Sequence, residues 1–118
     1  MTGVFLDGEW VVTRYLGADG YVEPETQTQL LIDGDHVSGT MGVNRFTGGL
    51  DNDLLCTPLA VTRMAGSPEA MLQEHTLLGH FQEADRIEAD ESGMRMSREG
   101  LITIHFERSG TAPSGRSS

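Results

Sequence analysis

The sequence lacks lysine altogether, and eight arginines supply its positive charge against 18 Asp and Glu residues. The formal net charge at pH 7 is therefore −10. Such an acidic surface repels phosphate backbones and anionic lipid headgroups, so the composition argues against nucleic acid and a membrane face as partners. A cationic partner fits this charge, and so does the simpler interpretation that the charge keeps a small protein in solution.

Cysteine is nearly absent. Cys56 stands alone, so one chain forms neither an internal disulfide nor a thiolate metal cluster. Its apolar neighbours predict a small core residue. No window reaches the roughly 20 apolar residues of a membrane span, and the first ten residues lack the basic and apolar parts of an export signal. These features predict a cytoplasmic protein.

The residues that are present suit one α+β domain. The 118 residues allow a single domain with a sizeable core, and 15 glycines indicate many turns between short strands. Asp33-Gly34 predicts a tight hairpin, whereas Asp19-Gly20 and Glu23-Pro24 indicate a loop. The tail at 109–118 lacks an apolar anchor and is predicted to be disordered, which leaves residues 1–108 as the domain. About eight strands are expected, at 10–15, 28–32, 36–41, 45–50, 54–62, 87–89, 94–96 and 101–106.

One helix, at about 67–82, interrupts the strands. Ser67 suits the N-cap, Pro68 the first helical position and Glu69 the positive end of the helix dipole. At 100° per residue, an apolar stripe predicts which face meets the core. The stripe holds Ala70, Met71, Leu77, Leu78 and Phe81, and leaves out Gln73, Thr76 and Gln82. The elements predict a helix packed on a strongly curved antiparallel sheet or open barrel.

Five short motifs follow one another along this pattern. They are Leu6-x-Gly8-x-Trp10, Gly42-Val43-Asn44-Arg45-Phe46-x-Gly48, Leu59-Ala60-x-Thr62-Arg63-Met64-Ala65, a helix with Glu74 and Leu78, and Phe106-Glu107-Arg108. In this order they resemble the META domain family, the HslJ-like heat-inducible proteins. The resemblance implies a curved antiparallel sheet packed on one helix and a link to heat or antibiotic stress and to envelope or secretion biology. It supplies no enzymatic activity to carry over to this chain. Many members carry cysteines where this chain has Val43 and Gly66, and their loss fits a reducing compartment.

The signature residues of this resemblance are expected to serve the structure. Glu74 lies within the apolar stripe, where a buried carboxylate needs a cation or several hydrogen-bond donors. We expect it to accept hydrogen bonds from Arg63, Arg45 or the backbone amides of the 42–49 turn. A solvated Glu74 and a binding or catalytic carboxylate are the alternatives. The full signature is Gly42, Asn44, Arg45, Phe46, Thr62, Arg63, Met64 and Glu74.

The sequence assigns no residue to catalysis, to a cofactor or to a metal. His75 and His80 lie about 140° apart around the helix, so they do not form a zinc-binding pair, and the aspartates of the turns lack calcium-loop spacing. Ser38 and Cys56 are potential nucleophiles, but neither lies in a strand-to-helix elbow. The 42–49 turn has no lysine and opens no helix, which excludes a phosphate cradle.

The sequence therefore predicts a non-enzymatic module that binds a protein or peptide, for instance as a strand added to a sheet edge. The alternative is a carrier of a small apolar ligand held between helix and sheet. A closed interior with an apolar strand edge favours the first function, and an open cavity of about 300 Å³ or more favours the second. Methionines either line such a groove or simply fill the core. The five concerned are Met41, Met64, Met71, Met94 and Met96.

Overall fold

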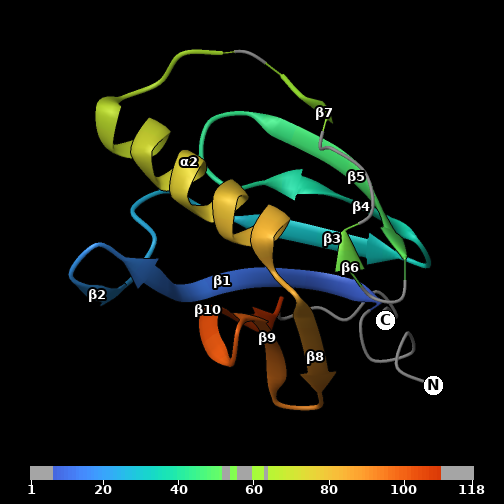
Figure 1. Cartoon of the computed structure of the whole chain (residues 1–118). Coiled ribbons are helices and arrows are strands. Elements are labelled where there is room, and N and C mark those ends of the chain that lie inside the picture. The colour runs from blue at the N-terminus through green and yellow to red at the C-terminus, as the bar shows by residue number, and fades with distance from the viewer. Residues whose placement is uncertain (1–6, 52–53, 56–59, 63, 110–118) are drawn as a thin grey trace.

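The computed structural model describes residues 7–51, 54–55, 60–62 and 64–109. These residues form ten strands and one helix, and the strands join in one antiparallel sheet whose two ends do not meet. The helix lies diagonally across one face of the sheet (Figure 1). The predicted α+β fold, an antiparallel sheet with one packed helix, is confirmed, and the sheet formed by these residues is not closed into a barrel.

Hydrogen-bonded neighbours across the sheet run β6-β5-β4-β3-β1-β10-β9-β8, with β2 also on β1 and β7 also on β5. The first and last long strands, β1 and β10, pair at its centre. The bounds are β1 (Gly8–Gly17), β2 (Gly20–Val22), β3 (Gln29–Asp33), β4 (His36–Thr40), β5 (Arg45–Asp51), β6 (Leu54–Leu55), β7 (Ala60–Val61), α2 (Pro68–Glu83), β8 (Arg86–Asp90), β9 (Gly93–Arg98) and β10 (Leu101–Arg108).

The core fills the space between the sheet and the helix. In β3, residues alternate between this core and solvent: Leu30 and Ile32 are buried and their neighbours are exposed. The Phe46 and Phe81 rings meet edge to face, with centroids 5.8 Å apart. Met41 is buried in this core, and so are Met94 and Met96; Met64 and Met71 lie at the surface.

The segment expected as one strand at 54–62 is divided. Its described parts are β6 and β7, which pair with different residues of β5. Residues 56–59, and with them the core position predicted for Cys56, lie outside the described residues. The predicted loop after β1 contains β2, which forms a hairpin with β1. The tail predicted from 109 onward is described only at Ser109, whose N–H donates to the Glu9 carbonyl over 2.9 Å.

The helix begins as predicted, but its buried face differs from the expected stripe. The Ser67 hydroxyl accepts the Ala70 N–H at the N-cap, and Pro68 opens the first turn. Met71 is 38% exposed, whereas Gln73 is only 2% exposed. The buried stripe is Ala70, Gln73, Glu74, Leu77 and Phe81. It is rotated by roughly 40° from the predicted stripe, taking 100° per residue.

Within the described part of the chain, no helix combines the length and the apolar character that a membrane crossing needs.

Candidate functional site

The turn between β4 and β5 lies directly against α2, and Gly42 allows this approach. A Cβ atom at Gly42 would come within 2.8 Å of both the Ala70 carbonyl oxygen and Cβ of Glu74. Gly42 is not among the glycines with positive φ. Close packing of the turn on the helix therefore explains this glycine.

Glu74 points from α2 into the turn and is 7% exposed. Its Oε1 accepts the N–H groups of Val43, at 2.8 Å, and of Asn44, at 2.5 Å. Its Oε2 accepts the Asn44 side-chain amide over 2.9 Å. The predicted hydrogen bonds from backbone amides of the turn are therefore confirmed. All three groups are N–H donors, so they match the ionised carboxylate, which only accepts.

The sequence also predicted Arg45 and Arg63 as hydrogen-bond donors to Glu74. Phe46 points into the core, so strand alternation turns Arg45 to the opposite, solvent-exposed side of β5. The expectation that Arg45 donates to Glu74 is wrong for this reason. Arg63, the other expected cation, lies outside the described residues.

Asn44 connects the turn to the segment after β7. Its Oδ1 accepts the Met64 N–H and the Thr62 hydroxyl, and its Nδ2 donates to the Met64 carbonyl over 3.2 Å. The side-chain amide thus pairs with both backbone groups of Met64, as a neighbouring strand would. Thr62 adds two bonds to the Arg45 backbone, each 3.0 Å long. We call Asn44, Glu74, Thr62 and the Met64 backbone the signature joint, because they tie the turn, the β7 segment and α2 together.

Gln73 makes a second tie that the sequence did not predict. Its Oε1 accepts the N–H groups of Glu25 and Thr26, over 2.7 and 3.0 Å. Its Nε2 donates to Thr26 and to the Met41 carbonyl. A polar residue three positions after Ala70 and four before Leu77 occupies a core-facing helix position, and this spacing was the available signal.

A hollow of about 580 Å³ opens beside the signature joint. Its apolar lining includes Val61, Met64 and Met71, which are 36%, 60% and 38% exposed. Ala65 and Thr62 complete its walls, and Asn44 and Glu74 also line it. We call this the β7 hollow. Signature residues thus border an apolar surface depression as well as holding the fold.

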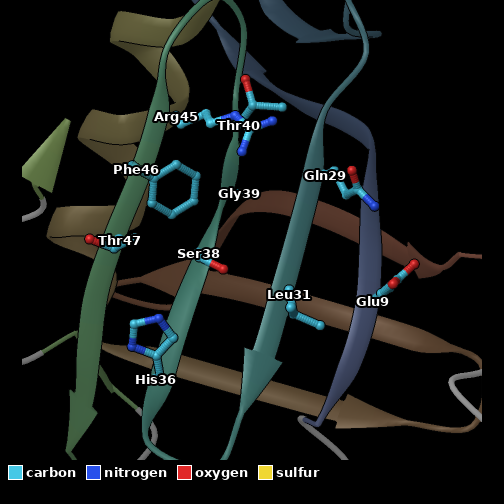
Figure 2. Close-up of a pocket in the computed structure, with 10 residues that line it drawn as sticks. All are labelled: Glu9, Gln29, Leu31, His36, Ser38, Gly39, Thr40, Arg45, Phe46 and Thr47. Atoms are coloured by element: carbon cyan, nitrogen blue, oxygen red, sulfur yellow. The ribbon is translucent and has the colours of Figure 1, made fainter. Parts of the chain in front are cut away.

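A second hollow, of about 470 Å³, lies on the sheet face that carries Arg45 (Figure 2). Arg45 and Thr40 lie at one end of it and His36 at the other, with Ser38 between them. These side chains are exposed or half-buried, as expected for the solvated face of an antiparallel sheet. The structure describes no hydrogen bond between Ser38 and His36 that would activate the serine as a nucleophile.

Within the described residues, no group of three or more His, Cys, Asp and Glu side chains could hold a metal ion. His75 is exposed, and His80 Nε2 lies 2.7 Å from the Leu16 carbonyl oxygen. The two helix histidines therefore have separate surroundings.

Three displaced pKa values lie away from the β7 hollow. Burial, and then the positive charges of Arg14 and Arg95, lower the pKa of His105. The hydroxyl and the N–H of Ser92 lower the pKa of Asp90 to about 2. Burial, and then the charge of Glu25, raise the pKa of Tyr15.

Comparisons with known proteins agree with this fold. The NMR structure of a protein from Burkholderia xenovorans is similar, with a TM-score of 0.73 and 25% sequence identity over 92% of this chain and 86% of that chain. No curated protein matches the chain. The family model of the META domain matches residues 4–111, so the chain belongs to the META domain family.

Proposed function

We propose that this META-domain protein is a non-enzymatic module that binds an extended segment of another protein or peptide at β7 and the β7 hollow. The observation that carries the proposal is the gathering of exposed apolar side chains there. Val61, Met64 and Met71 all line this hollow, and Leu72, 65% exposed, follows Met71 on the helix. Surface patches of this kind mark interaction sites more often than isolated exposed residues do.

The backbone at β7 supports the same reading. β7 pairs with β5 on one side only, and among the described strands none pairs with its other side. Figure 1 shows it at a margin of the sheet. Open backbone groups beside apolar side chains suit a peptide that adds as a strand.

The opposite margin of the sheet provides a contrast within the same fold. Its last strand, β8, exposes the charged residues Arg86, Glu88 and Asp90 in alternation. Charged residues on an edge strand discourage pairing with another chain. Compared with β8, β7 has the apolar character that binding a strand requires.

The carrier alternative has one observation in its favour, since the β7 hollow exceeds about 300 Å³, the lower end for ligand pockets. This hollow, however, opens at the surface. Under the helix, Trp10, Leu77 and Phe81 are at most 1% exposed and fill the interior. A surface-bound segment therefore fits the geometry better than a ligand enclosed between helix and sheet.

A selection from a random peptide library against the purified protein tests the proposal. Selected peptides should lose at least about tenfold in affinity for Met64→Glu, equivalent to about 1.4 kcal/mol. Leu101→Glu is the matched control, because Leu101 is 51% exposed and lies on β10, a different strand. Equal losses for both variants, or capture of small apolar dyes but no peptide, would count against the proposal.

The stress link, the cytoplasmic location and the lack of enzymatic activity belong to the same proposal, motivated by the family and by the composition. Protein levels before and after heat or antibiotic treatment, with fractionation of the native cells, test the first two. Turnover of generic esters or phosphates in proportion to protein concentration would refute the third.

A further inference from the structure

We infer that the segment bound at the β7 hollow carries a lysine or arginine side chain whose cation contacts Oε2 of Glu74. The inference rests on the proposed function and adds the chemistry of the partner. It starts from the unequal hydrogen bonding of the two Glu74 oxygens. Oε1 accepts two N–H groups and Oε2 accepts one from a described residue, while each carboxylate oxygen accepts about two.

The charge of Glu74 has no cationic partner among the described residues. The three ion pairs described join Arg86 to Glu88, Arg95 to Asp90 and Arg98 to Glu83, all at the surface. The three donors to Glu74 are neutral amides. Charge-assisted hydrogen bonds are roughly twice as strong as neutral ones, so a cation at Oε2 would add a strong contact.

The apolar lining of the β7 hollow indicates which kind of cationic group would bind beside Glu74. Glu74 lines the hollow together with the apolar side chains of Val61, Met64 and Met71. An anionic group among apolar walls suits a side chain with an aliphatic stem and a charged head, which describes lysine and arginine. Thioether side chains adapt to either stem. Small hydrated cations would leave these walls without a partner.

The charge of the whole chain acts in the same direction. With a net charge of −10, the protein attracts basic segments and repels acidic ones. This attraction acts at long range and raises the association rate, whereas the contact with Glu74 would fix where the basic side chain lies.

The test uses a matched pair of capped peptides that alternate valine and threonine. One carries a central lysine and its twin carries norleucine, which has a similar stem without the charge. Fluorescence anisotropy with the unaltered protein at low salt should give at least about tenfold tighter binding of the lysine peptide, and added salt should narrow the gap. Methyl signals of Met64 and Met71 should shift on binding.

Two variants separate the contact from general attraction. Glu74→Gln should abolish the preference for the lysine peptide. Glu69→Gln is the control, because it removes one negative charge from the exposed start of α2 and should leave the preference for lysine unchanged. Glu74→Gln also sets an amide against the Asn44 donor and weakens the joint, so its effect counts only together with a lysine preference measured on the unaltered protein.

Equal binding of the two peptides would overturn the inference and leave the proposed function standing, as expected if the chain's own Arg63 meets Glu74. Equal loss of the preference in both variants would also overturn it. Binding of neither peptide, with an empty library selection, would overturn the inference and the proposed function together.

Discussion

Replacing Glu74 with alanine would remove the acceptor that three N–H groups share in the signature joint. Val43 and Asn44 donate their backbone amides to it, and Asn44 also donates its side-chain amide. A buried donor left without a partner costs about 1–3 kcal/mol. Water from the β7 hollow would satisfy part of this loss, so we expect a net destabilisation on the order of 3 kcal/mol.

Urea unfolding followed by tryptophan fluorescence measures this loss, because Trp10 is fully buried in the core. With a typical unfolding entropy for 118 residues, the same loss lowers Tm by roughly 10 °C. Glu69→Ala on the exposed first turn of α2 is the control, and its lost dipole interaction should cost only about 0.3–1 kcal/mol. A loss below about 0.5 kcal/mol for Glu74→Ala would show that the joint does not depend on the carboxylate.

Three further predictions concern packing, geometry and pH. Gly42→Ala should lower the free energy of unfolding in urea by about 1–3 kcal/mol, because the added Cβ would meet the α2 backbone. Gly79→Ala, where the added Cβ meets no atom, should be neutral or stabilising. Equal effects of the two variants would contradict this packing. Val43→Cys with Gly66→Cys should form a disulfide worth about 2–4 kcal/mol, because a Cβ at Gly66 would lie 3.4 Å from the Val43 Cβ. A thiol titration after oxidation that still finds the two introduced thiols free, in addition to Cys56, would refute it. Because the pKa of His105 is lowered in the folded protein, the unfolded chain binds the proton more readily, and Tm should fall as pH drops below 6.5. His105→Gln should reduce this fall. An unchanged dependence of Tm on pH in the variant would show that His105 does not cause it.

Strands set by local alternation and turn residues were predictable from the sequence. Asp33-Gly34 predicted the β3–β4 hairpin, and Gly34 has the positive φ, 64°, that a tight turn needs. β2 and the separate strands β6 and β7 were not predictable in this way. Each is two or three residues long and is a strand only because β1 or β5 lies beside it.

The buried face of α2 was predicted only in part, because hydrophobicity does not reveal which polar groups have partners. Gln73 is buried since its amide is satisfied by residues about 47 positions earlier in the chain. Met71 is apolar but lies over the β7 hollow. The fold places both residues through contacts that lie far apart in sequence.

The signature joint was half predictable. A carboxylate in an apolar stripe requires donors, which led to Glu74. The pairing of the Asn44 amide with the Met64 backbone depends on the path of the chain after β7, which local sequence does not specify. The outward direction of Arg45 was implied by the inward Phe46, and strand alternation would have excluded Arg45 as a donor.

The energetic coupling between Asn44 and Glu74 tests most directly whether the signature residues form a structural joint. Urea unfolding of Asn44→Ala, Glu74→Ala and the double variant measures it in a double-mutant cycle. Shared hydrogen bonds predict a coupling energy of about 1 kcal/mol or more, with the double variant losing less than the sum of the single losses. Additive losses within about 0.3 kcal/mol would contradict a joint between the turn and the helix.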